Sequence, residues 1–264
     1  MISIRTRQIV AAAAVGGKTS AYAPPVNLRI LVGGTLRPAS GRSDVAAAVA
    51  AARSALPSWS GMPASTRGRL LYEVAELLKE LVTDSSVTAR ADVDAAVDRW
   101  IWYAGWADKI AAVLGSVNPV EGPSVSWSSP RPVGVVGALA PPTVRGLVEV
   151  LAPVLAAGAP AVVVASDAVQ GPTARLAELL ALSGLPAGVA NLLLGPADDQ
   201  ARALARAEID GLDLAGAPNA SAAELERAVA ERLVPVLPAT VDRDGLAALR
   251  GWTRAATVWH PVGR

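Results

Sequence analysis

Residues 162–172 read VVVASDAVQGP, a run of three valines that gives way after one alanine to Ser166 and Asp167. A continuous apolar run of this kind is typical of a strand buried on both faces of a parallel sheet. In open parallel sheets, ligands bind in the crevice outside the carboxyl ends of the strands. The stretch therefore predicts a central strand whose polar end, at Ser166 and Asp167, borders a possible ligand site.

Apolar runs alternate with amphipathic helical patterns on both sides of this strand. Four such runs predict strands of one parallel sheet near residues 133–140, 161–165, 190–194 and 210–214. The segments between them carry apolar residues at helical spacing. This alternation is typical of a parallel sheet covered by helices on both faces. We therefore expect an α/β fold with a Rossmann-like, doubly wound parallel sheet.

The first half of the chain is expected to add helices to this sheet. Apolar residues at helical spacing predict helices at about residues 43–56, 66–81 and 92–110. The first helix is expected to end at PSWSGMP, residues 57–63, because proline inside a helix removes a backbone donor and clashes with the preceding turn. A small hairpin is predicted at residues 115–130.

Composition excludes several classes of function. The 264 residues carry a formal net charge of +1, which gives no electrostatic basis for binding nucleic acid or an anionic membrane. The chain has no cysteine and one histidine, His260, which excludes thiolate chemistry, disulfides and multi-histidine metal sites. No serine lies in a nucleophile-elbow motif, which argues against a hidden serine triad.

The sequence offers little sign of export or of membrane insertion. No apolar run reaches the ~18 residues of a membrane span. A seven-residue apolar run after Arg5 and Arg7 gives only a faint outline of a signal peptide, and it is rich in alanine. We expect a cytoplasmic protein whose residues 1–25 form a flexible tail.

Several phrases together resemble one known family. Four of them are similar, in order and spacing, to the N-terminal, cofactor-binding half of the aldehyde dehydrogenase superfamily: ASTRGRLLYEVAELL (64–78), YAGWADKI (103–110), RPVGVVGALAPPTVRG (131–146) and SGLPAGVANLLLG (183–195). The phrase GWTRAATVWHPVG (251–263) resembles the family's C-terminal strand, which pairs with a neighbouring subunit. Between Val234 and Gly251, where the family places its catalytic domain, this chain has only about fifteen residues.

The resemblance implies a division of the chain into two parts. Residues 26–114 and 131–234 correspond to an NAD(P)-binding domain. Residues 115–130 and 251–262 correspond to an oligomerisation hairpin and tail strand. The resemblance leaves no segment of this chain for a catalytic domain.

The resemblance also implies a degenerate site for NAD or NADP. Val164 stands where the family has a lysine that reaches the adenosine ribose, and Ser221 stands where it has a second glycine near the pyrophosphate. Losing one charge-assisted hydrogen bond of ~1.5–3 kcal/mol weakens binding roughly 10–100-fold, so dinucleotide binding is expected to be weak or absent. Inherited loop geometry without a ligand is the alternative explanation of the remaining positions. The cofactor-binding positions implied by the resemblance are Pro141, Thr143, Ser166, Asp167, Gly195 and Gly216.

The chemistry implied by the resemblance needs groups that this sequence does not supply. The family mechanism uses a cysteine thiolate, a glutamate base and an asparagine amide that stabilises the oxyanion. This chain has no cysteine, and Thr143 occupies the asparagine position. We therefore assign no catalytic residue and expect no NAD-linked aldehyde oxidation by the chain alone.

Three functions remain open: an inactive subunit or scaffold, a stand-alone NAD(P)-binding module, and an enzyme active only when a partner chain completes it. A decayed gene is a fourth explanation. For the first, the expected partner is a full-length aldehyde dehydrogenase or a second copy of this chain. An isolated strand needs a sheet edge, so residues 252–260 are expected to join a partner's sheet, with Trp252 and Trp259 as buried anchors.

Overall fold

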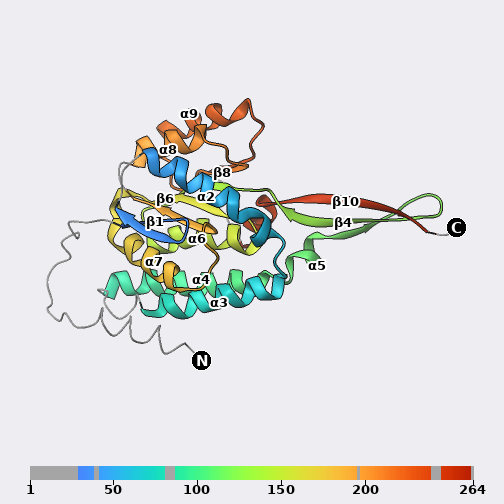
Figure 1. Cartoon of the computed structure of the whole chain (residues 1–264), viewed down its shortest axis with the longest axis horizontal. Helices are drawn as coiled ribbons and strands as arrows, with labels where there is room; N and C mark the ends of the chain where they lie inside the picture. The colour runs from blue at the N-terminus through green and yellow to red at the C-terminus, as the bar shows by residue number, and fades with distance from the viewer. Residues whose placement is uncertain (1–28, 39–41, 81–86, 195–196, 239–244, 263–264) are drawn as a thin grey trace.

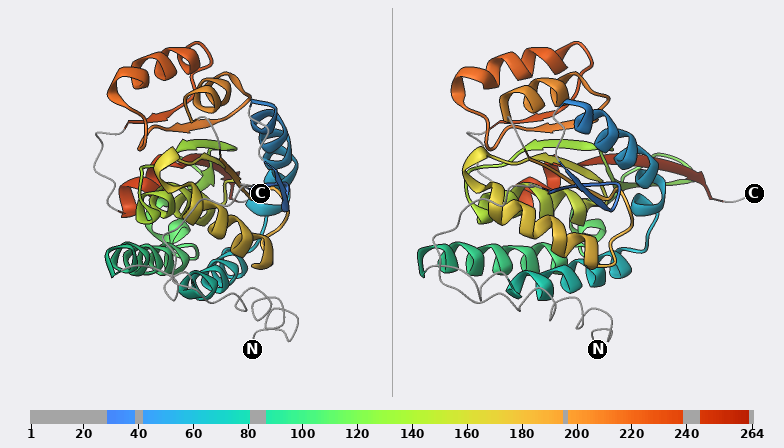
Figure 2. Two further views of the ribbon diagram at one scale, coloured as in Figure 1. Left: turned by 90° about the vertical axis from the view of Figure 1, so that its left-hand side faces the viewer. Right: turned by 60° about the vertical axis from the view of Figure 1, so that its left-hand side comes forward.

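The chain folds as a body of sheet and helices from which a thin arm projects (Figures 1 and 2). The expected N-terminal tail and Gly195 lie outside the described residues. The computed structural model describes residues 29–38, 42–80, 87–194, 197–238 and 245–262.

The main sheet has the strand order β2-β1-β7-β6-β5-β8-β9 within the described residues. An antiparallel hairpin, β1 (Arg29–Val32) and β2 (Thr35–Pro38), forms the edge next to β7. The remaining strands are parallel: β5 (Val136–Leu139), β6 (Ala161–Val164), β7 (Ala190–Leu193), β8 (Gly211–Asp213) and β9 (Val236–Leu237). The prediction of four parallel strands in one doubly wound sheet is confirmed.

Strand β6 shows why its sequence is apolar throughout. Side chains alternate between the two faces of a strand. Ala161 and Val163 enter one hydrophobic core, whereas Val162 and Val164 enter a second core on the opposite face. Burial on both faces removes the polar alternation that a one-sided strand would show.

Helices cover both faces of the sheet. On one face, α6 (Val144–Ala157) and α7 (Gln170–Leu182) pack against the sheet, and α3 (Ala64–Leu78) and α4 (Val87–Trp106) pack on the far side of these two helices. The other face carries α2 (Arg42–Ser60), α8 (Ala197–Arg206) and α9 (Asn219–Ala230). Two short helices, α5 (Ile110–Leu114) and α10 (Gly245–Gly251), lie near the root of the arm. None of the helices in the described ranges is long and apolar enough to cross a membrane.

The first helix ends within the stretch that the sequence predicted. Helix α2 ends at Ser60, inside PSWSGMP, although it continues through Pro57 rather than stopping at it. Trp59 is fully buried, and its Nε1 donates to the carbonyl oxygen of Leu155 at 3.2 Å. Burial of this large side chain favours the helical conformation around Pro57 and offsets the cost of the missing backbone donor.

A buried arginine joins α3 to the end of α6. Arg67 Nε donates to the carbonyl oxygen of Ala156 at 3.1 Å, and its Nη1 donates to Met62 at 3.2 Å. Burial lowers the pKa of Arg67 because desolvation disfavours the charged form. A cation near the carboxyl end of a helix is stabilised by the helix dipole. Arg67 therefore has a structural role in holding the α3–α6 packing.

The arm is a three-stranded antiparallel sheet with the order β10-β4-β3 (Figure 1). Its strands are β3 (Ser116–Asn118), β4 (Ser124–Pro132) and β10 (Thr253–Pro261). Strand β10 pairs with β4 along its whole length, from Thr253 opposite Pro132 to Pro261 opposite Ser124. Two segments that are far apart in the sequence thus build one element.

The intramolecular pairing of β10 corrects two expectations about the tail strand. One edge of β10 pairs with β4 of its own chain, so the backbone donors and acceptors on that edge do not need a partner's sheet. Trp252 is 1% exposed and lies in the core of its own chain, so it is not an anchor for a partner. Trp259 is 64% exposed and stays available for contact.

Candidate functional site

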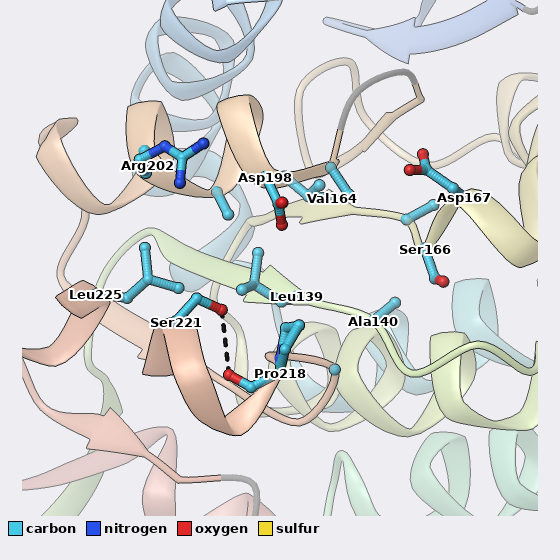
Figure 3. A pocket seen from close by; sticks show the side chains of 14 residues that line it. Leu139, Ala140, Val164, Ser166, Asp167, Asp198, Arg202, Pro218, Ser221 and Leu225 are labelled. Carbon is cyan, nitrogen blue, oxygen red and sulfur yellow. Dashed lines mark hydrogen bonds between the residues drawn. The ribbon is translucent and has the colours of Figure 1, made fainter. Parts of the chain in front are cut away.

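A cavity of about 210 Å³ lies beyond the carboxyl ends of β5 and β6, where the sequence predicted a site (Figure 3). Strand β6 contributes Val164 and the residues just after it, and α8 and α9 close the opposite sides. Its lining consists of Leu139, Ala140, Val164, Ala165, Ser166, Asp167, Ala197, Asp198, Ala201, Arg202, Gly216, Pro218, Ser221 and Leu225.

Ser166 and Asp167 border the cavity, but local hydrogen bonds engage both. Ser166 caps the short helix η2 (Asp167–Val169), and its side chain accepts from the backbone N–H of Ala168 at 3.4 Å. Oδ1 of Asp167 accepts from Nε2 of Gln170 at 2.9 Å. These contacts account for the polar residues at the strand end without a ligand.

Pro141 and Thr143 do not line this cavity. Thr143 is the N-cap of α6, and its Oγ1 accepts from the backbone N–H of Gly146 at 2.8 Å. Pro141 packs against the same turn, because a Cβ placed on Gly146 would lie 2.6 Å from the Cβ of Pro141. The structure thus gives both residues contacts at the start of α6.

Gly216 lines the cavity, and its backbone packs closely against the end of β5. Its backbone N–H donates to the carbonyl oxygen of Leu139 at 2.8 Å. A Cβ on Gly216 would lie 2.2 Å from the carbonyl oxygen of Ala140. Only glycine permits this close approach of the loop after β8 to the end of β5.

Ser221 lies in the first turn of α9 and lines the cavity. Its Oγ donates to the carbonyl oxygen of Pro218 at 3.1 Å (Figure 3). The residue therefore adds a side chain to a helix start that would otherwise present only backbone N–H groups.

Two lining residues on α8 were missed by the sequence analysis. Asp198 and Arg202 are four residues apart on one helix and lie on the same side of it (Figure 3). Nη2 of Arg202 is 3.5 Å from Oδ1 of Asp199. Their i, i+4 spacing is present in the sequence, but the family resemblance implies glycine positions here and gives no indication of a charged pair. Within the lining, Asp167 and Asp198 against Arg202 give a net charge of −1.

The cavity lining holds one cation, Arg202, against Asp167 and Asp198. A lining with net charge −1 repels a ligand group that is itself negative. The cavity of about 210 Å³ also falls below the ~300–1,000 Å³ that is usual for ligand pockets. Val164, which the resemblance aligns with the family's lysine, is apolar and buried. Among the described residues, no group of three or more His, Asp or Glu side chains is arranged to hold a metal ion.

Comparison with known proteins agrees with the observed fold. The model of the aldehyde dehydrogenase family matches residues 34–237. A curated relative, (Z)-2-((N-methylformamido)methylene)-5-hydroxybutyrolactone dehydrogenase of Acinetobacter baylyi, is 36% identical over 152 residues, which cover 52% of this chain and 30% of the relative. Mitochondrial aldehyde dehydrogenase of Rattus norvegicus is 35% identical over 173 residues, which cover 58% of this chain and 32% of the relative.

Among solved structures, PnpE in complex with nicotinamide adenine dinucleotide is 27% identical and superposes with a TM-score of 0.68. The match covers 80% of this chain and 46% of PnpE. The chain thus spans about a third of the curated relatives and about half of this structure. The family model covers most of the chain. The chain belongs to the aldehyde dehydrogenase family.

Proposed function

We propose that this chain is a catalytically inactive family member that acts as a subunit or scaffold of a full-length aldehyde dehydrogenase. The observation that carries the proposal is the absence of cysteine from all 264 residues. The thiolate nucleophile is the group that attacks the aldehyde carbon in the family, and no other side chain here stands in its place. The Oγ1 of Thr143 is already engaged in capping α6.

The arm supports the subunit role. Val117 lies opposite Trp127, which in turn lies opposite Val258, so the three side chains form one row across β3, β4 and β10. They are 80%, 38% and 46% exposed, respectively. Exposed apolar patches on a soluble protein usually mark a contact surface. We name Val117, Trp127 and Val258 the arm row.

A full-length family member is the partner that the sequence and fold favour for the arm row. The family model ends at residue 237 and β10 begins at Thr253, so little chain separates the sheet from the arm. PnpE contains more than twice the length that matches here. The additional length of a full-length relative is where we propose that the arm row is buried. The edge of β10 away from β4 has no strand partner within the described residues, so it is open to β-addition.

The direct test of inactivity is an assay of the purified chain with NAD or NADP and a panel of aliphatic and aromatic aldehydes. We expect no reduced cofactor above the buffer rate. Turnover that scales with the amount of chain and survives further purification would contradict inactivity. Mixing the chain with a full-length relative that keeps its catalytic cysteine but carries a disabled cofactor site tests completion by a partner, for which we also expect no turnover.

Dinucleotide binding separates the scaffold proposal from an NAD(P)-binding module. We expect a dissociation constant above ~100 μM for NAD in calorimetry, because the lining repels the pyrophosphate and lacks the lysine. Val164→Lys combined with Ser221→Gly should tighten binding by about 10-fold, since the lysine neutralises the net charge of the lining. A low-micromolar constant for the unmodified chain would instead favour the binding module.

A further inference from the structure

A second cavity, of about 340 Å³, lies at the root of the arm, on the side of the sheet where β5 and β8 begin. It is remote in the fold from the first cavity, which lies beyond the carboxyl ends of the strands. Its lining contains three arginines, from α2, β4 and β10, and one aspartate: Arg53, Arg131, Arg254 and Asp210.

The aspartate is fully engaged by one of the arginines. Nη1 and Nη2 of Arg53 donate to the two carboxylate oxygens of Asp210 at 2.7 and 3.0 Å. Oδ2 of Asp210 also accepts from the backbone N–H of Val135 at 2.7 Å. Arg53 uses its remaining donors on the carbonyl oxygen of Glu208. This pair is therefore neutral and held in place.

The other two arginines face the cavity without a counterion. Arg131 and Arg254 are directly opposite each other in the β4–β10 register. No ion pair or hydrogen bond joins either side chain to a described residue. Like charges directly opposite in an antiparallel pair destabilise the pairing. With Asp210 offsetting one of three arginines, the lining has a net charge of +2.

We propose that this cavity binds a phosphate group, either as inorganic phosphate or at the end of a small phosphate monoester. A monoester phosphate carries close to two negative charges at neutral pH, which matches the net charge of the lining. Guanidinium groups bind phosphate oxygens in bidentate geometry. The cavity is several times the ~30 Å³ share of one water molecule, so it has room for an organic group beside the phosphate. Leu56 and Val133 supply an apolar wall for that group.

The test is calorimetric titration of the full chain with inorganic phosphate and, separately, with glycerol 3-phosphate, at constant ionic strength set by chloride. We expect saturable binding, with Arg131→Gln and Arg254→Gln each weakening it about 10-fold or more. Tighter binding of glycerol 3-phosphate would assign the site to phosphate esters, and equal binding would assign it to the phosphate group alone. Arg131→Lys should keep part of the affinity, because it retains charge and loses the bidentate fork.

Two matched variants show whether binding is local. Arg227→Gln removes an exposed arginine on α9, and Arg202→Gln removes the arginine of the first cavity. Both should leave the phosphate affinity unchanged. The thermal midpoint of Arg131→Gln without ligand should equal or exceed that of the unmodified chain, because like-charge repulsion is relieved. Absence of saturable heat with both ligands, or equal losses in the Arg227→Gln or Arg202→Gln variants, would overturn the proposal.

Discussion

Replacing Trp252 with alanine is expected to lower the free energy of unfolding by about 3–5 kcal/mol, the usual cost of deleting a large buried aromatic side chain. Trp252 is 1% exposed and packs with Ala248 and Leu249 of α10 in the core under the sheet. A Cβ on Gly211 would lie 2.8 Å from its ring, so the indole lies directly against β8. Its carbonyl oxygen accepts from the backbone N–H of Val133, which ties the residue before β10 to the residue that follows β4.

Urea unfolding followed by circular dichroism measures this loss. Trp259→Ala is the matched control, because it removes the same type of side chain from an exposed position in β10. We expect the control to change the free energy of unfolding by no more than about 0.5 kcal/mol. Comparable losses in the two variants would mean that Trp252 does not anchor the arm to the body.

Val258→Lys is expected to weaken association with a full-length aldehyde dehydrogenase by about 30-fold or more. Val258 lies in the arm row beside Trp127. Burying an unpaired ammonium in an apolar contact costs at least the ~2 kcal/mol that marks an interface hot spot. The measurement is the equilibrium dissociation constant of the mixed complex by mass photometry or biolayer interferometry.

Ala255→Lys supplies the control for charge. It adds the same cation to an exposed position on the same strand, three residues earlier, and so on the opposite face of the arm. That face bears the exposed Trp259 beside polar groups, with Nδ2 of Asn118 donating to the hydroxyls of Ser126 and Ser128 at 3.1 and 3.0 Å. We expect the control to bind as the unmodified chain does. Equal weakening by the two lysines would show that the arm row is not the contact.

The sheet could be predicted because the sequence of each strand by itself indicates burial on both faces. Three consecutive valines with no polar alternation leave burial on both faces as the simplest explanation, and the structure divides them between two cores. The extent of α2 was not predictable in this way. Local chemistry at Pro57 favours a helix end, and the burial of Trp59 against Leu155, almost a hundred residues away, overrides it.

The site was predictable in position and only partly in composition. The end of β6 does border a cavity, with Ser166, Asp167 and Gly216 in its lining. Thr143 lies elsewhere because a threonine before a helix serves first as its cap. The arginine cavity at the arm root had no sequence signal. Arg53, Arg131 and Arg254 are brought together only by the tertiary fold, and the pairing of β10 with β4 was itself not foreseen.

The subunit proposal is tested most directly by native mass spectrometry of this chain mixed with a purified full-length aldehyde dehydrogenase from the same organism. We expect mixed oligomers that contain both chains in a fixed ratio, and the Val258→Lys variant should remove them. Separate species at micromolar concentrations of both proteins, with this chain present only as a monomer or as an oligomer of itself, would contradict the proposal.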